Sequence, residues 1–201
     1  MDKEYLNNQL MNMAKQNSME IDAEILGVIV NNSVFRVVPK GNILQSVGEK
    51  TKTAALVLDG ICRCYYVDGD GNDITRGFSV TGTFCMDEGL FGYSESIVTW
   101  ETLEETTLMF FDVQKMKELI FENNQLKNAY IMFLENALRY KIYRENGFLV
   151  ENATERYIHF KKLYPTICDS VKQHYVATYL GIAPESLSRI KKALKENQIA
   201  V

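Results

Sequence analysis

The short stretch PESLSR, from Pro184 to Arg189, carries an acid, a hydroxyl and a guanidinium. Glu185, Ser188 and Arg189 are three and one positions apart, so a helix would present them on one face. They supply an acceptor, a group that both donates and accepts, and a planar pair of donors. This set suits the reading of a polar surface through directed hydrogen bonds. Elsewhere the sequence offers no nucleophile with a base, no metal-ligand cluster and no phosphate-binding loop, so no catalytic residue, metal or resident cofactor is expected.

Two helices joined by a short turn are predicted around these residues. Val176, Ala177 and Leu180 form the inner face of the first helix. Gly181 supplies the left-handed residue that ends this helix, and Pro184 suits the first turn of the next one. Ala177 is small, as is required where two helix backbones cross closely. The pattern predicts a helix-turn-helix and favours it over a generic helical hairpin.

The second helix of a helix-turn-helix enters the major groove of DNA. Arg189 is then expected to donate two hydrogen bonds to guanine, Glu185 to accept one from cytosine, and Ser188 to contact a neighbouring base. Four further residues of this helix are assigned to the DNA phosphates: Ser186, Lys191, Lys192 and Lys195. Double-stranded DNA is therefore the expected partner.

Charge is divided unevenly along the chain. Residues 152–201 carry 8 Lys and Arg against 4 Asp and Glu, a net charge of +4, whereas residues 1–151 carry 14 against 22, a net charge of −8. A basic segment on an acidic body favours binding of a polyanion. The chain has 201 residues, 46% of them hydrophobic and 24% charged, which is typical of a soluble globular protein. It shows neither a signal-peptide core nor a run of about 18 apolar residues, so a cytoplasmic protein without membrane contact is expected.

Three segments are expected along the chain. Residues 1–112 contain N-terminal helices followed by short strands with frequent turn signals, which predict a β-sandwich or β-barrel. Residues 113–147 predict one long dimerisation helix, and residues 148–201 form the helix-turn-helix domain, so the fold class is α+β. Spacings of four and three on the long helix predict a dimer seam that contacts its own domain and a second subunit: Leu126, Tyr130, Phe133, Ala137 and Tyr140.

The stretch ERYIHFKKLYPTICDSVKQHYVATYLGIAPESLSRIKKAL resembles the C-terminal domain of the Crp–Fnr family of bacterial transcription regulators. Glu185, Ser188 and Arg189 match the family's E-x-x-S-R reading positions, as in its Fnr branch. TGTFCMDEGLFGYSESIVTWETLEETTLMFF is similar to the family's sensor β-roll around its phosphate-binding cassette, so the resemblance implies that residues 1–112 form a jelly-roll-like β-roll that acts as a sensor domain. The resemblance implies a homodimer on a palindromic operator with TTGA-like half-sites, and RNA polymerase as a further partner. The chain ends soon after the second helix, so a full wing is not expected.

The resemblance also implies a small-molecule effector in the β-roll. Its pocket is expected near six residues: Phe84, Met86, Asp87, Glu88, Ser96 and Ile97. Family members that bind cyclic nucleotides neutralise the phosphate with a cassette arginine, but no Lys or Arg occurs here from Gly77 to Gln114. Burying a phosphodiester beside two acids is costly, so cyclic AMP is not expected as the effector. Arg63 or Arg76 could substitute from nearby strands.

Other interpretations remain open. Cys62, Cys64 and Cys85 could make the protein a thiol-based redox regulator, although ordinary buried thiols are favoured. The loop DGDGND, from Asp68 to Asp73, begins like a calcium loop but lacks the required glycine and glutamate, so a hairpin turn is favoured. Outside regulation, the alternatives are a small-molecule-binding β-roll protein or enzyme without DNA function, and a purely structural dimer.

Overall fold

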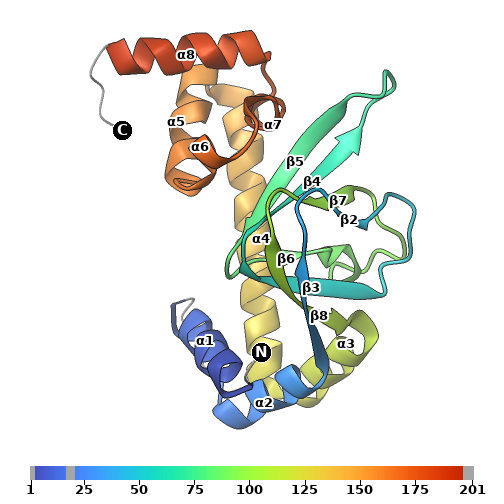
Figure 1. Ribbon diagram of the computed structural model, residues 1–201. Coiled ribbons are helices and arrows are strands. Elements are labelled where there is room, and N and C mark those ends of the chain that lie inside the picture. Colours follow the sequence, from blue (N-terminus) through green and yellow to red (C-terminus); the bar gives the residue numbers. More distant parts are fainter. Residues whose placement is uncertain (1–2, 17–20, 197–201) are drawn as a thin grey trace. The chain divides into compact units, whose positions relative to one another are not determined.

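The computed structural model describes residues 3–16 and 21–196, which divide into two compact units (Figure 1). The first unit comprises residues 1–64 and 78–135, and the second comprises residues 65–77 and 136–201. The first unit holds strands and helices together, and the second is mostly helical. The α+β class predicted from the sequence is confirmed.

Two four-stranded sheets form the expected β-roll. One sheet has the order β1 (Ser33–Val38), β8 (Thr106–Asp112), β3 (Thr53–Asp59) and β6 (Phe84–Cys85). The other has the order β2 (Ile43–Gln45), β7 (Thr99–Thr102), β4 (Ile61–Val67) and β5 (Asp73–Val80). In the first sheet all pairs are antiparallel, with Ser33 opposite Phe111 and Ala55 opposite Cys85. The prediction of a β-roll is therefore confirmed.

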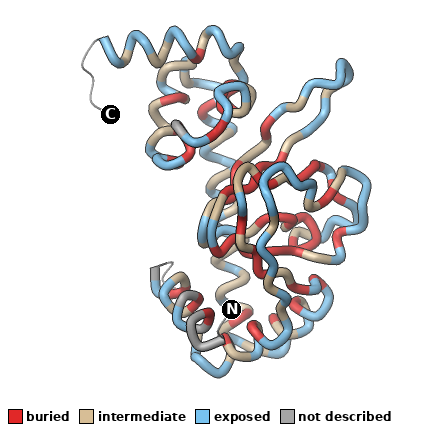
Figure 2. Tube along the Cα trace, in the orientation of Figure 1, coloured by how far each residue is buried: buried red, intermediate tan, exposed pale blue. Residues whose placement is uncertain are grey.

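Apolar side chains from both sheets fill the interior of the roll. Nine residues that are at most 5% exposed to solvent form this roll core: Ala55, Val57, Cys62, Cys64, Cys85, Met86, Val98, Trp100 and Leu108. Figure 2 shows the corresponding strands as largely buried. β3 turns into β4 at Gly60, where φ is +100° and a Cβ atom would lie 2.9 Å from the Cα of Thr106. Only glycine fits this turn, and it brings the two sheets face to face.

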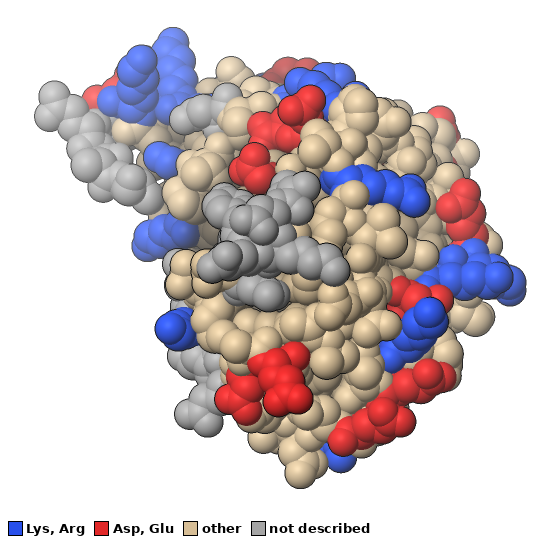
Figure 3. Space-filling view, turned by 60° about the horizontal axis from the view of Figure 1, so that its bottom comes forward, with Lys and Arg blue, Asp and Glu red and all other residues tan. Residues whose placement is uncertain are grey.

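Helices cover the sheet that contains β3 and β8. They are α1 (Lys3–Gln16), α2 (Ala23–Asn31), α3 (Val113–Glu122) and the first part of α4 (Asn124–Val150). Leu26 and Val30 of α2 pack against Leu58 and Met109 of the sheet, because apolar residues recur on one face of the helix. The face of the molecule in Figure 3 carries uncharged residues over most of its area, with charged residues in small separate groups.

The single long helix expected over residues 113–147 is two helices in the structure. Asn123 has an extended backbone with φ −125° and ψ 123°, which interrupts the helix. Its side-chain oxygen accepts the N–H of Gln125 at 2.9 Å and the N–H of Leu126 at 3.1 Å. An asparagine that caps the next helix in this way competes with continuation of the previous one. The segment has no Gly or Pro here, so apolar periodicity alone misses the break.

The second unit contains the predicted helix-turn-helix. It consists of the end of α4, α5 (Ala153–Leu163), α6 (Ile167–Ser170), α7 (Gln173–Leu180), α8 (Pro184–Glu196) and the tip of the β4–β5 hairpin. α5 begins at a capping box, in which Asn152 accepts the N–H of Glu155 and the side chain of Glu155 accepts the N–H of Asn152. Residues 197–201, where a wing would begin, lie outside the described residues.

Candidate nucleic-acid interface

The solvent-facing side of α8 carries the predicted reading residues. Glu185, Ser188 and Arg189 are exposed, whereas Leu187 between them is fully buried. Lys192 extends this exposed row by one turn, because residues three and four apart share a helix face. Figure 2 shows α8 exposed along most of its length. The structure therefore brings the three reading residues together on a helix that is anchored from its opposite side.

The turn before α8 is fixed by Gly181. The backbone of this residue has the left-handed conformation, with φ +66°, and its N–H donates to the carbonyl of Thr178 at 3.2 Å. The next N–H, from Ile182, donates to the carbonyl of Ala177 at 3.1 Å, which closes a Schellman motif. A Cβ atom on Gly181 would lie 2.9 Å from the Cε1 of Phe148. Backbone conformation and close packing both require glycine here.

Two arginines hold the C-terminal end of α7. Arg144 of α4 donates to the carbonyl of Tyr179 at 3.0 Å, with its guanidinium 3.6 Å from the centre of the Tyr179 ring. Arg156 of α5 donates through Nε to the carbonyl of Leu180 at 3.1 Å. Cations at a helix C-terminus stabilise it, because the last carbonyls carry partial negative charge. These contacts fix α7, and with it the turn and α8, on α4 and α5. Sequence reasoning missed both arginine roles.

A cluster of tyrosines lies beside these arginines. The hydroxyls of Tyr140 and Tyr179 are 3.0 Å apart, and the Tyr179 ring packs on Phe160 with ring centres 5.1 Å apart. Burial raises the pKa of Tyr179 well above its ordinary value, and the neighbouring Tyr140 raises it further. The Tyr179 hydroxyl therefore stays protonated and acts as a hydrogen-bonding group within the domain.

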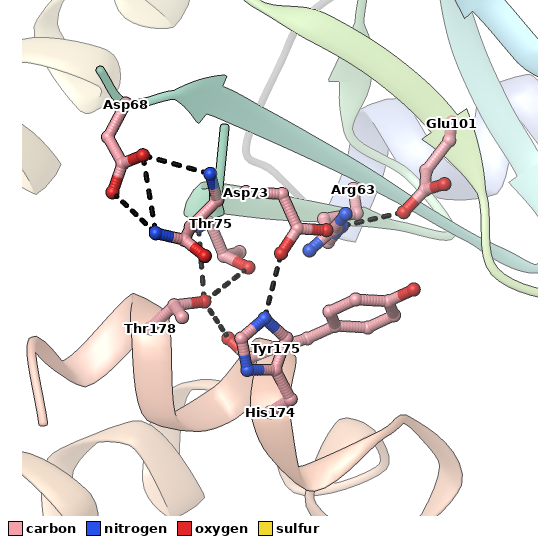
Figure 4. Close-up of polar contacts among 9 residues, drawn as sticks. Arg63, Asp68, Asp73, Thr75, Glu101, His174, Tyr175 and Thr178 are labelled. Atoms are coloured by element: carbon pink, nitrogen blue, oxygen red, sulfur yellow. Dashed lines mark hydrogen bonds and ion pairs between the residues drawn. The ribbon is translucent and has the colours of Figure 1, made fainter. Parts of the chain in front are cut away.

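The tip of the β4–β5 hairpin is bonded to α7 (Figure 4). The hydroxyl of Thr178 accepts the N–H of Thr75 at 3.2 Å and lies 3.0 Å from the Thr75 hydroxyl. The Nε2 of His174 lies 2.8 Å from a carboxylate oxygen of Asp73. The hairpin turn itself is closed by Asp68, whose side chain accepts the backbone N–H of Asn72 at 2.9 Å. This confirms the expected turn, and no metal-binding cluster is found among the residues that the structure describes.

The expected phosphate-binding residues differ in their surroundings. Lys192 and Lys195 are exposed, and Lys192 lies 3.7 Å from Glu196 in a surface pair of small energy. Lys191 instead donates to the side chain of Gln173 at 3.0 Å, and Ser186 is half-buried. Lys191 thus links α8 to α7, whereas Lys192 and Lys195 present their charge to solvent.

The six residues expected around an effector are not gathered about one cavity. Glu88 is 1% exposed, and both of its carboxylate oxygens lie 3.1 Å from the indole nitrogen of Trp100. Ser96 is buried and donates to the carbonyl of Val98 at 2.9 Å. The other four residues lie in different surroundings. Met86 is in the roll core, and Phe84 packs toward the helices. Asp87 is half-buried, and Ile97 is exposed.

Arg63, one of the two arginines that could substitute for a cassette cation, already has an acidic partner. Its side chain is 1% exposed, and its Nε donates to the carboxylate of Glu101 at 2.7 Å (Figure 4). Cys62 and Cys64, its neighbours on β4, belong to the roll core, so strand alternation directs Arg63 to the opposite face of the sheet. Its charge is neutralised on that face rather than inside the roll.

Most residues of the expected dimer seam contact their own chain. Tyr130 donates to the carbonyl of Leu90 at 2.6 Å, and the Phe133 ring packs on Phe84 with ring centres 5.1 Å apart. Leu126 is buried, Ala137 is half-buried, and Tyr140 meets Tyr179. The large hydrophobic side chains that α4 exposes are instead Ile131, Leu138, Ile142, Tyr143, Phe148, Leu149 and Val150. Pairing through the expected seam stays a prediction, and the packing of its residues does not favour it.

All four cysteines of the chain are buried thiols. A hydrogen bond with Cys62 and burial both raise the pKa of the Cys85 thiol well above its ordinary value. Because the thiolate is the reactive form, this environment disfavours oxidation chemistry at Cys85.

Comparison with known proteins adds three findings. Residues 35–123 match the family profile of the cyclic nucleotide-binding domain. No curated protein shows significant sequence similarity to the chain. None of the helices that the structure describes is both long and apolar enough to cross a membrane.

Several solved structures share the fold. FixK2 from Bradyrhizobium japonicum has a TM-score of 0.75 at 16% identity, over 83% of this chain and 86% of that one. The c-di-GMP responsive global regulator CLP of Xanthomonas campestris has a TM-score of 0.67 at 17% identity, and the match covers 88% of this chain and 93% of that one. A CooA variant from Carboxydothermus hydrogenoformans has a TM-score of 0.68 at 16% identity, and the match covers 91% of this chain and 83% of that one. The likeness extends over both units of the chain.

Proposed function

We propose that this chain, which has the fold of the Crp–Fnr transcription regulators, regulates transcription by binding DNA as a homodimer. The observation that carries the proposal is the exposed row of Glu185, Ser188 and Arg189 on α8. A polar row on the outer face of the second helix of a helix-turn-helix is suited to the major groove. RNA polymerase is the further partner that such a regulator requires.

Each group of this row has a specific role in the proposal. Arg189 donates two hydrogen bonds to O6 and N7 of a guanine, and Glu185 accepts one from N4 of a cytosine. Ser188 contacts the base between or beside them. Lys192 and Lys195 neutralise phosphates, and Lys191 takes part less because it is bonded to Gln173.

The homodimer is proposed to pair along the exposed apolar side of α4. Leu138, Ile142 and Leu149 are four and seven residues apart and 58–76% exposed. This spacing places them on one stripe of the helix, and pairing with the same stripe of a second copy would remove it from water. To read half-sites one turn of DNA apart, the two recognition helices of this dimer must lie about 34 Å apart.

The effector is proposed not to be a cyclic nucleotide. The packed roll core, the buried Glu88 and the pairing of Arg63 with Glu101 disfavour a buried phosphodiester inside the roll. The thiol-based alternative gains no support from cysteines that are buried, among them Cys85 with its raised pKa.

Selection of DNA from a random duplex library with the purified protein tests the proposal. We expect enrichment of a two-fold symmetric sequence with half-sites one helical turn apart. A library that stays random after repeated selection would contradict DNA reading and favour the structural-dimer alternative.

A further inference from the structure

The first unit contains an apolar cavity outside the roll core. It has a volume of about 160 Å³ and lies between the helices α1 to α4 and the sheet of β3 and β8. Leu26, Leu56, Met109, Ala129 and Phe133 are among the residues that line it. Figure 1 shows these four helices grouped around one end of the sheet. The cavity shares only Phe84 with the effector residues expected from the sequence.

The described walls of the cavity carry no charged side chain. Their single side-chain hydroxyl is that of Tyr130, which already donates to the carbonyl of Leu90 at 2.6 Å. An ionic or strongly polar ligand would lose its hydration here without gaining partners. The cavity therefore selects an uncharged, apolar molecule.

Aromatic rings and thioethers form much of the wall. The ring of Phe84 meets Phe111 edge-on with centres 5.8 Å apart, and meets Phe133 in the same way at 5.1 Å. Met109 and Met116 add flexible, polarisable sulfur atoms. Ring edges and sulfur atoms make favourable contacts with a further aromatic ring. The lining thus favours an aromatic ligand over a purely aliphatic one.

The volume and the access of the cavity set the size of the ligand. Protein interiors rarely contain voids larger than a water molecule, and an apolar cavity of roughly 150 Å³ stays dry and binds benzene. Ile29 and Tyr130 of the wall are only half-buried, so the cavity reaches the surface of the unit. We propose that it is a binding site for one small, uncharged aromatic molecule of the size of benzene or toluene. This proposal does not depend on the proposed binding of DNA.

Toluene is the probe for the test. The full chain, with its methionine methyl groups labelled with ¹³C, is titrated with toluene up to the aqueous solubility of toluene. We expect saturable binding of one molecule per chain, with nuclear Overhauser contacts to the methyl groups of Met109 and Met116. Met86 lies in the roll core, so its methyl group should show no contact.

A pair of leucine substitutions on α4 separates the cavity from the surface. Ala129→Leu fills the cavity and should abolish saturable binding, while the melting temperature stays the same or rises. The adjacent Asn128 is exposed and outside the lining, so Asn128→Leu should leave binding unchanged.

Three results would overturn the proposal: no saturable binding of toluene to the unmodified chain, contacts to Met86 in place of Met109 and Met116, or binding that survives Ala129→Leu. If Ala129→Leu does not fold, the methyl contacts in the unmodified chain decide the question. A failure of the chain to bind DNA would not change the expected results of the toluene experiments, because the two proposals rest on different parts of the chain.

Discussion

The hydroxyl of Thr178 lies 3.0 Å from the hydroxyl of Thr75, a residue 103 positions earlier in the chain. Thr178 belongs to α7, the first helix of the helix-turn-helix, and Thr75 belongs to β5. The same threonine accepts the N–H of Thr75 at 3.2 Å. Residues 65–77 of the β4–β5 hairpin belong to the second unit, and these hydrogen bonds join them to α7 within that unit.

Thr178→Val should lower the free energy of unfolding by about 1 kcal/mol, because it removes a half-buried hydrogen-bonding group and leaves the N–H of Thr75 without this acceptor. Urea denaturation measures the change. Thr166→Val is the matched control, since the side chain of Thr166 is exposed and makes no capping hydrogen bond. In a double-mutant cycle with Thr75→Val, a coupling energy of about 0.5–1.5 kcal/mol is expected, and strictly additive losses would contradict the contact.

Gly181→Ala should destabilise the second unit by about 2 kcal/mol or more, because alanine is strained at φ +66° and its Cβ would lie 2.9 Å from Phe148. Thermal unfolding followed by circular dichroism measures this. Gly147→Ala is the control of opposite sign. Gly147 lies inside α4, and its nearest new contact is the flexible carboxylate of Glu151 at 3.2 Å. It should stabilise by about 0.5–1 kcal/mol, and equal effects of the two substitutions would refute the role of the turn.

Leu138→Asp should release monomers if the dimer pairs along the exposed stripe of α4, because it places a charge in an apolar interface. Analytical ultracentrifugation at tens of micromolar protein is the measurement. Arg139→Asp changes an exposed neighbour outside the stripe and should leave the dimer intact. A wild type that sediments as a monomer would reject the homodimer, and a dimer that withstands Leu138→Asp would reject this stripe.

Cyclic AMP and cyclic GMP should not bind in the micromolar range, because the roll core is packed and Arg63 is paired with Glu101. Isothermal titration calorimetry of each nucleotide into the full chain is the test. A micromolar dissociation constant corresponds to a binding free energy of about −8 kcal/mol. Such a value would contradict the prediction, because it would show that a cation of the protein reaches the phosphate of the nucleotide.

The helix-turn-helix was readable from the sequence because its signals are local. Gly181 has the left-handed φ that its position predicted, and Pro184 begins α8 as expected. The strands of the roll followed for the same reason, since β-rich runs alternate with turn residues. These predictions are confirmed.

Contacts between distant segments were beyond sequence reasoning. The pairing of Thr75 with Thr178 depends on tertiary placement, and so do the carbonyl contacts of Arg144 and Arg156. The apolar rhythm of α4 predicted contacts both with its own domain and with a second subunit. Tyr130 and Phe133 do pack on their own unit, and contact with a second subunit stays a prediction. Periodicity reports burial, and it does not report against what a face is buried.

Base reading by α8 is the central claim, and a fluorescence-anisotropy titration of the selected operator tests it most directly. Measurements at several salt concentrations compare wild type, Arg189→Ala and Lys192→Ala on that site, on sites substituted at each base pair, and on random DNA. Arg189→Ala should cost about 1–3 kcal/mol per half-site and abolish the preference for guanine at one position. Lys192→Ala should weaken binding to specific and random DNA about equally. It should also make the slope of log K against log salt concentration shallower by roughly one for each phosphate that is no longer neutralised. Full discrimination at every base pair by Arg189→Ala would contradict the account, because the exposed row of α8 would then be only a solvated surface.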